Sequence, residues 1–379
     1  MGTAFLNFTE EQAKVVNLTD AEKQKLAQDY FNRIFANSIQ EDKPTAYFVG
    51  APIAAGKGSI VGALRHLYHK LNKRHLPYID RDVLREMHPR LDKVKKMLGS
   101  NWVRGTDDCA KVREMVIDMA IEAGYSFVGE YTFSSKPVIE AMKNAKAKGF
   151  KVEAHIIATA LIQSKMRQFE RYFAEYEIYP KNARYETVQN QQSVYSSQPE
   201  IINQVAKEGC ADLMAFYDKD MQPQILLEGE ELKNSSPYES FSEIQRHDLS
   251  TTSITRLYNQ YNALKKKIQK FPDYEVGKTM RITANREKSK KYRGITATKK
   301  ISEYELHRRP RVVVRQSLKD SQPVQEFNDL GIYLMEQINF YGRKMNPIRT
   351  LLARQPKRRS REQIAKTMAK KVYDIKKGI

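Results

Sequence analysis

The sequence predicts an α/β protein, with a parallel sheet covered by helices on both faces and then a mostly α-helical basic region. Short runs rich in β-branched and aromatic residues alternate with helical stretches from residue 44 onward. A glycine-lysine loop joins the first run to the first of these helices. Almost all of the net positive charge lies beyond residue 230. These three observations separate an α/β core from a C-terminal region of different character.

The net charge of +20 over 379 residues is unevenly distributed. Residues 231–379 hold 34 Lys and Arg against 15 Asp and Glu, whereas residues 1–230 hold 31 against 30. A nearly neutral front half suits an enzyme core, and a basic back half suits contact with an acidic partner. A polar, turn-rich stretch follows Glu228. We therefore expect a helical N-terminal segment at 1–43, an α/β domain at 44–230 and a basic region at 231–379.

The sequence also bears on the cellular compartment. Cys109 and Cys210 are too few for a disulfide framework or a zinc cluster, which favours a reducing compartment. The N-terminus lacks the basic and apolar regions of a secretory signal, and Leu6 departs from the myristoylation pattern after Gly2. No window approaches the ~18 apolar residues of a membrane span. We expect a cytoplasmic protein or, alternatively, an effector exported without a cleavable signal peptide.

Each element can be placed from its pattern. A helix at 8–38 packs on the core. Strands are predicted at 45–50, 76–80, 125–130 and 152–158, with helices at 57–72, 82–97, 108–123 and 136–148. A helix at 161–176 follows, then a helix and short strand within 198–216, which 224–227 could pair with. The C-terminal region has predicted helices at 251–271, 322–342 and 360–376, a basic run at 288–300 and a short strand at 311–315. Strands joined by helical crossovers form a parallel sheet, whose ligand lies beyond the carboxyl ends of the strands.

The loop after the first strand has the features of a phosphate-binding loop. Gly56 and Lys57 precede a helix, so that backbone N–H groups and the lysine ammonium can face phosphate oxygens. The usual pattern is G-x-x-x-x-G-K-[ST]. Here Ala51 replaces the first glycine, Gly58 replaces the hydroxyl residue that binds Mg²⁺, and Ser59 comes one position late. The alternative is an ordinary strand-to-helix turn.

Carboxylates follow the second strand. Asp80 and Asp82 could orient Mg²⁺ or accept a proton from an attacking hydroxyl. The alternative is that one of them caps the next helix, since Asp is a favoured N-cap. His88 precedes Pro89, which favours a structural turn over acid–base chemistry.

Polar residues also gather at the end of the third strand. Glu130 ends that strand, Thr132 follows it, and Glu114 lies on the preceding helix. Buried carboxylates are costly unless they bind sugar hydroxyls, a metal or an arginine. For Glu114, the alternative is a solvated helix face.

Two arginines from separate elements could clamp a γ-phosphate. Arg171 lies on a predicted helix and Arg184 in the loop after it. Such arginines stabilise the charge of phosphoryl transfer and are worth about 10³-fold or more in rate. Each alone could instead be a surface ion-pair partner.

In combination, these residues resemble the zeta toxin kinases of bacterial toxin–antitoxin systems. The resemblance covers roughly residues 44–220. It rests on the phosphate loop, on Ile79 to Pro89 with the pattern I-D-x-D-x-[FL]-R-x-x-H-P, and on Glu130 to Thr132. It also includes Glu170 to Tyr172 and the Ala183–Arg184 pair. The resemblance implies a P-loop kinase-like fold that uses ATP or GTP with Mg²⁺. The acceptor in this family is a UDP-activated amino sugar or, in some relatives, another nucleotide.

The resemblance assigns roles to individual residues. Lys57, with Gly56, Gly58 and Ser59, would contact the nucleotide phosphates, and Ser59 would stand in as the Mg²⁺ ligand. Asp82 would be the base that activates the acceptor hydroxyl. Arg171 and Arg184 would stabilise the moving phosphoryl group. The acceptor would be positioned by Glu114, Glu130 and Thr132.

Three departures from the family pattern are visible. Gly58 lacks the usual hydroxyl, and Ile53 to Ala55 make the loop poorer in glycine. Ser134 lies near the place where many members have arginine, which predicts a different acceptor specificity. Residues 231–379 have no counterpart in the kinase core.

We therefore expect a kinase that acts on a small nucleotide-like acceptor. A second hypothesis is a nucleic-acid-binding protein with a degenerate phosphate loop, and a polynucleotide kinase would combine both ideas. The basic tail could also act as an export signal, dock an antitoxin or other acidic partner protein, or be a flexible solvated extension.

Overall fold

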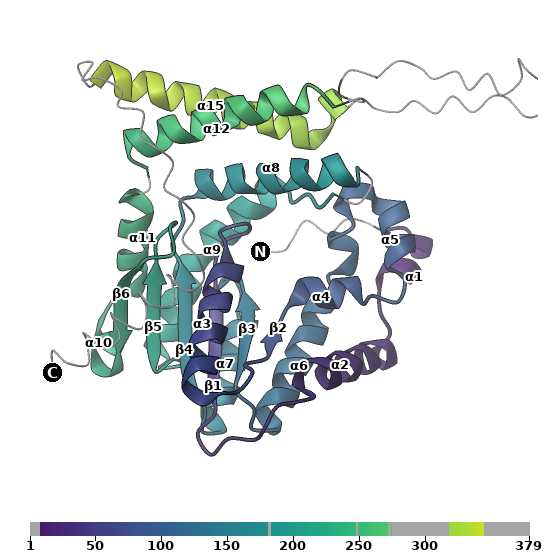
Figure 1. Ribbon diagram of the computed structural model, residues 1–379, viewed down its shortest axis with the longest axis vertical. Coiled ribbons are helices and arrows are strands. Elements are labelled where there is room, and N and C mark those ends of the chain that lie inside the picture. Colours follow the sequence, from purple (N-terminus) through teal and green to yellow (C-terminus); the bar gives the residue numbers. More distant parts are fainter. Residues whose placement is uncertain (1–7, 181–182, 248, 272–273, 275–317, 345–379) are drawn as a thin grey trace, which may run out of the picture.

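The computed structural model describes residues 8–180, 183–247, 249–271, 274 and 318–344 (Figure 1). The basic run predicted at 288–300, the strand predicted at 311–315 and the helix predicted at 360–376 lie outside the described residues.

The core of the described chain is a six-stranded sheet in the order β2-β3-β1-β4-β5-β6 (Figure 1). The strands are β1 (Thr45–Gly50), β2 (Tyr78–Ile79), β3 (Phe127–Tyr131), β4 (Lys151–Ile157), β5 (Leu213–Tyr217) and β6 (Pro223–Glu228). All neighbouring pairs are parallel except β5 and β6, which are antiparallel. The predicted parallel sheet is thus confirmed, as is the pairing of its last two strands.

Helices cover both faces of the sheet. The helices of the described residues are α1 (Glu10–Val16), α2 (Asp20–Phe35), α3 (Lys57–Asn72), α4 (Arg81–Glu86), α5 (Leu91–Leu98), α6 (Cys109–Glu122), α7 (Pro137–Ala147), α8 (Leu161–Ile178), α9 (Val188–Lys207), α10 (Gly229–Asn234), α11 (Pro237–His247), α12 (Thr251–Ile268) and α15 (Gln322–Lys344). Helix α3 lies on one face, α6, α7 and α9 lie on the other, and α2 packs on the outside of α6 (Figure 1).

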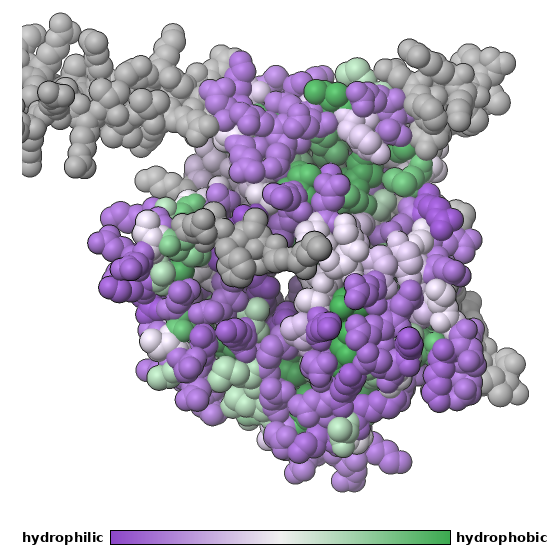
Figure 2. Space-filling model, turned by 180° about the vertical axis from the view of Figure 1, so that it is seen from behind, coloured by the Kyte–Doolittle hydropathy of each residue, from purple (hydrophilic) through white to green (hydrophobic). Residues whose placement is uncertain are grey.

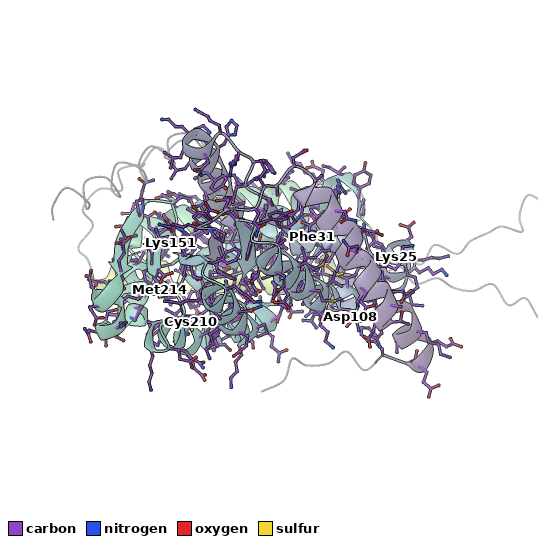
Figure 3. All side chains as sticks on the ribbon, turned by 90° about the horizontal axis from the view of Figure 1, so that it is seen from below. Lys25, Phe31, Asp108, Lys151, Cys210 and Met214 are labelled. Atoms are coloured by element: carbon purple, nitrogen blue, oxygen red, sulfur yellow. The ribbon has the colours of Figure 1, made fainter. Side chains whose placement is uncertain are left out.

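Two predicted helices are each divided in two. The helix expected at 8–38 is α1 and α2, because Thr19 accepts from the N–H of Glu22 and starts a new helix. The helix expected at 82–97 is α4 and α5, with Pro89 between them. Seen from below, Phe31 of α2 lies against the body of the molecule, where its ring stacks 4.7 Å from that of Phe35 (Figure 3).

A close contact at the end of β1 requires glycine. A Cβ at Gly50 would lie 2.2 Å from the ring carbon Cδ2 of Phe133. This contact brings the segment after β3 directly over the start of the phosphate loop. The carboxyl ends of β1 and β3 therefore share one rim with the end of β2, as the sequence predicted.

The C-terminal elements pack on the α/β core. The stretch after Glu228 is helical rather than turn-rich, because Phe241 and Ile244 give α11 an apolar face that joins the core of the sheet. Helices α12 and α15 lie side by side across α8, which itself crosses above the sheet (Figure 1). The division at residue 230 stays a prediction. Among the described residues, no helix combines the length and the apolar character needed to cross a bilayer.

Candidate active site

Lys57 lies at the first turn of α3, directly after the sharp turn of the phosphate loop. Gly56 has φ of +100°, and a Cβ there would lie 2.7 Å from Cε of Met221, so that glycine is required. The ammonium of Lys57 lies 3.3 Å from Oε1 of Glu130 and donates to the carbonyl oxygen of Ala51 at 3.3 Å. Tyr78 donates its hydroxyl proton to the same glutamate. The P-loop lysine is thus paired with a predicted acceptor-binding carboxylate.

Asp82 is held between two arginines. Its Oδ1 accepts from Arg85 at 2.6 Å, and its Oδ2 accepts from Arg184 at 2.8 Å. Burial alone would raise the pKa of Asp82, but Arg85 and Arg184 together lower it to about 2. The carboxylate is therefore ionised at neutral pH and oriented by arginines, which suits an acceptor of hydroxyl protons once an arginine moves to phosphate.

The structure shows which of the two aspartates caps α4. Asp80 is the N-cap of α4 and accepts from the N–H of Asp82 at 2.8 Å. Burial and the neighbouring Glu130 raise the pKa of Asp80 to about 6. Capping therefore belongs to Asp80, which leaves the side chain of Asp82 to face the arginines.

Arg171 and Arg184 come together although 13 positions separate them. Glu175 fixes Arg184 by accepting from its backbone N–H at 2.8 Å and from its Nη2 at 2.8 Å. Burial and the nearby Arg184 lower the pKa of Arg171, and its buried Nε has no hydrogen-bond partner among the described residues. Two cations this close, one with an unsatisfied buried donor, are suited to bind a multiply charged anion.

Glu114 is not on a solvated helix face. It accepts from Arg113 at 2.5 Å and from the hydroxyl of Tyr131. Arg113 also donates to the carbonyl oxygen of Glu130 at 2.9 Å, which connects the two glutamates. The hydroxyl of Thr132 lies 2.7 Å from that of Ser134. The three predicted acceptor-binding residues therefore lie around the end of β3.

The other wall of the phosphate loop is made by α8. Arg167 donates to the carbonyl oxygens of Ala55 and Lys219, both within 2.9 Å. Ser164 donates to the carbonyl oxygen of Ile53. These bonds fix the phosphate loop against the loop after β5, and the sequence analysis did not identify them.

The arrangement fits a nucleotide better than it fits a dedicated metal cage. Gly56 offers no side-chain cap to α3, so the N-terminus of that helix is open to an anion at the rim. Within the described ranges, no three His, Cys, Asp or Glu residues group as metal ligands. A Mg²⁺ ion bound through Ser59 would rely on phosphate oxygens and water for its other ligands, as Mg²⁺ commonly does. Gly58 contributes no side chain, but a Cβ there would meet nothing within 4 Å.

His88 and Trp102 are buried packing residues outside the cluster of charged site residues. His88 is buried, and its Nδ1 accepts from the N–H of Arg90 at 3.1 Å in the turn before α5. Trp102 is buried, with the ammonium of Lys95 4.8 Å from its ring centre. The structural turn predicted at His88 is confirmed.

Several partners of the site were not predicted from the sequence. They are Tyr78, Arg85, Arg113, Arg167 and Glu175. Helical spacing was the signal for two of them, because Arg85 follows Asp82 by three residues and Glu175 follows Arg171 by four. The others come from elements whose proximity depends on the tertiary fold.

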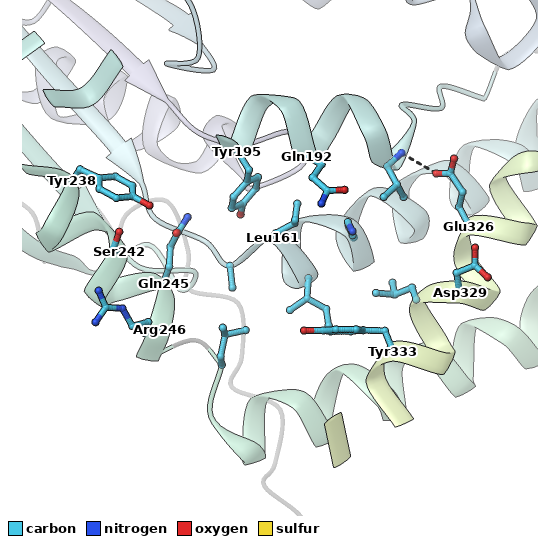
Figure 4. Close-up of a pocket in the computed structure, with 16 residues that line it drawn as sticks. Leu161, Gln192, Tyr195, Tyr238, Ser242, Gln245, Arg246, Glu326, Asp329 and Tyr333 are labelled. Carbon is cyan, nitrogen blue, oxygen red and sulfur yellow. Dashed lines mark hydrogen bonds between the residues drawn. The ribbon is translucent and has the colours of Figure 1, made fainter. Parts of the chain in front are cut away.

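A separate cavity lies on the far side of α8. Its volume is about 800 Å³, and its walls come from α8, α9, α11 and α15 (Figure 4). It contains none of the predicted site residues. Seen from behind, apolar side chains gather just below the outermost helices (Figure 2).

Comparison with known proteins agrees with this geometry. The family model described as Zeta toxin matches residues 28–231. The chain belongs to the Zeta toxin family. The zeta toxin of Streptococcus pyogenes is 25% identical over 210 residues, which are 55% of this chain and 72% of that protein. The zeta toxin of Streptococcus agalactiae is 23% identical over the same shares.

A solved structure from the PezAT chromosomal toxin–antitoxin system of Streptococcus pneumoniae has the same fold. It matches with a TM-score of 0.55 and 19% identity, over 68% of this chain and 99% of that one. The P-loop kinase-like fold is therefore confirmed for this zeta toxin family member. Membership in the family supports a kinase-like phosphotransferase role.

Proposed function

We propose that this protein transfers the γ-phosphoryl group of ATP or GTP to a hydroxyl of a small nucleotide-like acceptor, such as a UDP-activated amino sugar. The observation that carries the proposal is the contact of Asp82 with Arg184, beside Arg171. A base and two phosphate-stabilising cations are thereby gathered at the rim where α3 begins.

The acceptor oxygen attacks the γ-phosphorus while the bond from that phosphorus to the β,γ-bridging oxygen breaks. The hydroxyl proton passes to Asp82, and the nucleoside diphosphate leaves. Lys57 neutralises charge on the β- and γ-phosphates, and Arg171 and Arg184 stabilise the transferring group. Mg²⁺, bound in part through Ser59, would neutralise further phosphate charge.

Nucleotide binding requires both ion pairs of the site to rearrange. Lys57 leaves Glu130 for the phosphates, and Glu130 then becomes an acceptor for substrate hydroxyls. Arg184 leaves Asp82 for the γ-phosphate, which removes a cation that lowers the pKa of Asp82. The base is thus strengthened at the moment when it is needed.

Glu114, Glu130 and Thr132 would hold the acceptor, with oxygen atoms directed at sugar hydroxyls. An antitoxin or another acidic protein is a natural partner, because toxin–antitoxin assembly is described for the PezAT system. A cytoplasmic location follows from the same proposal. Nucleic-acid binding by residues 231–379 stays a prediction from charge alone.

The test is to incubate the protein with γ-labelled ATP or GTP, Mg²⁺ and a panel of nucleotide sugars, dinucleotides and oligonucleotides. We expect label on a nucleotide sugar or another small nucleotide. Label on oligonucleotides would favour a polynucleotide kinase, and label on no compound would contradict the proposal.

A further inference from the structure

Helices α12 and α15 pack on the helix that carries Arg171, although both lie beyond the segment that matches the family. The ring of Phe327 on α15 lies 5.3 Å from that of Phe169 and 5.4 Å from that of Phe173, both on α8. Tyr261 of α12 contacts the other side of Phe327, with ring centres 4.6 Å apart. These buried rings join the C-terminal helices and α8 into one apolar cluster.

The two C-terminal helices approach each other closely at one glycine. A Cβ at Gly331 of α15 would lie 2.1 Å from the ring of Tyr261. The absence of a side chain at Gly331 therefore allows α15 to pack close to α12 and α8. This close packing in turn determines which α15 side chains reach the loop after α8.

Glu326 of α15 reaches the loop that carries Arg184. Its Oε2 accepts from the backbone N–H of Val188 at 2.8 Å (Figure 4) and also from the hydroxyl of Tyr185. Tyr185 directly follows Arg184 and is only 1% exposed. Its ring packs 5.4 Å from that of Tyr172, which directly follows Arg171. The Glu326 carboxylate thus binds Tyr185, the neighbour of Arg184. Tyr185 in turn packs on Tyr172, the neighbour of Arg171.

The loop at 183–187 depends on such contacts because it belongs to neither a helix nor a strand. Arg184 and Val188 both donate their backbone N–H to glutamate side chains, Glu175 and Glu326. Hydrogen bonds to a charged group are stronger than neutral ones, and loss of the half-buried Glu326 carboxylate removes the acceptor of two donors, the Val188 amide and the Tyr185 hydroxyl. The position of Arg184 is therefore set from two sides.

We infer that Glu326 is a positioning residue for Arg184, and that α12 and α15 brace both phosphate-stabilising arginines. The inference rests on the proposed function, since Arg184 is given its role there. It assigns a function in catalysis to a part of the chain outside the family match.

The experiment compares Glu326→Leu, Glu326→Gln and the control Glu336→Gln, an exposed position on the same helix. Hydrogen exchange at the Val188 amide is measured together with kcat and KM for the nucleotide. For Glu326→Leu, we expect the exchange rate of the Val188 amide to rise by about ten- to hundredfold and kcat to fall by a similar factor. This is the size of effect that follows the loss of a hydrogen bond to a charged group. KM for the nucleotide should rise by a smaller factor than kcat falls, because Arg184 contacts the γ-phosphate in the ground state but is needed most in the transition state. Glu326→Gln keeps one acceptor oxygen, so it should recover much of the protection of the Val188 amide and much of kcat. The control Glu336→Gln should match wild type in both measurements.

A double variant separates positioning from general destabilisation. In an Arg184→Ala background, Glu326→Leu should lower kcat no further, because the residue through which it acts is gone. An equal additional loss in that background, or unchanged exchange at Val188 in folded Glu326→Leu, would overturn the inference. If wild type transfers no phosphoryl group, the proposed function fails, and exchange at Val188 alone decides whether the brace exists. Should Glu326→Leu not fold, Glu326→Ala, which also removes both acceptor oxygens, supplies the same readout.

Discussion

Arg184 donates from Nη1 to Oδ2 of Asp82 at 2.8 Å, although 102 positions separate them in the chain. This bond joins the loop after α8 to the start of α4 and closes the site over the phosphate loop. It also keeps a cation beside the proposed base until a phosphate competes for that cation. The ion pairs of the site therefore predict how substrates and substitutions affect it.

Substitution of Glu130 by glutamine should strengthen nucleotide binding and weaken acceptor binding. The change removes the negative partner of Lys57, which lies 3.3 Å away, and so frees the ammonium for phosphate. We expect the Kd for ATP to fall about three- to tenfold, as for a part-buried ion pair, while KM for the acceptor rises. Calorimetric titration with a non-hydrolysable ATP analogue measures the first effect. Glu140→Gln, on the exposed face of α7, is the control, and weaker ATP binding by Glu130→Gln would contradict the expectation.

Restoring a hydroxyl at residue 58 should increase activity. A Cβ at Gly58 meets nothing within 4 Å, so Gly58→Ser fits without strain and provides the missing Mg²⁺ ligand of the loop. We expect the Mg²⁺ concentration for half-maximal activity to fall several-fold. Gly56→Ala is the matched comparison and should lose activity, because a φ of +100° is strained for any residue with a Cβ. A Gly58→Ser protein with unchanged Mg²⁺ dependence would show that the loop binds no metal through this position.

Substitution of Asp80 by asparagine should stabilise the protein at neutral pH. The folded-state pKa of about 6 lies above the ordinary 3.8, so the ionised carboxylate costs the folded state free energy above pH 6 and nothing below about pH 4. Asparagine removes that cost and can still cap α4. We expect a gain on the order of 1–2 kcal/mol at pH 7.5 that disappears near pH 4.

Thermal unfolding at the two pH values measures this difference. Asp29→Asn, at an exposed position on α2, is the control and should be nearly neutral at both. A gain of Asp80→Asn that is equal at pH 4 and pH 7.5 would mean that the charge of Asp80 is not its cause.

Substitution of Gly331 by alanine should destabilise the C-terminal helices. The added Cβ would lie 2.1 Å from the ring of Tyr261, so α12 and α15 must move apart or the ring must leave its site. Overpacking of this kind costs about 1–3 kcal/mol. We expect a lower melting temperature and a lower kcat in parallel, whereas Gly209→Ala, with open space around it but φ of +61°, should affect stability alone.

The sequence predicted the sheet and the outline of the site because both depend on local signals. Alternation of strands and helices fixes a parallel sheet, and the ends of its strands bring Lys57, Asp82 and Glu130 to one rim. Which of Asp80 and Asp82 caps α4 depends on the residue at which that helix begins. Asp80 has the extended backbone of an N-cap residue, and the residue pattern does not specify after which of the two aspartates the helix begins.

The contribution of the C-terminal helices could not be predicted from composition. Their high charge suggested a region apart from the core, whereas Phe327 and Tyr261 bury themselves against α8. Apolar spacing reveals that a helix has a buried face, but not which surface it covers. Contacts such as that of Glu326 with Val188, 138 positions apart, arise only from the assembled fold.

The most direct test of the account is single-turnover transfer of labelled γ-phosphate by wild type and by Asp82→Asn. Asparagine can still accept from Arg184, so the fold should be retained. ATP should bind at least as tightly as to wild type, because Arg184 loses a negative partner, while the lost base should slow transfer by about 10²–10⁴-fold. A variant that binds ATP without loss of affinity and transfers at this reduced rate is the predicted result. Transfer by Asp82→Asn at the wild-type rate would contradict the central claim that Asp82 receives the proton of the acceptor.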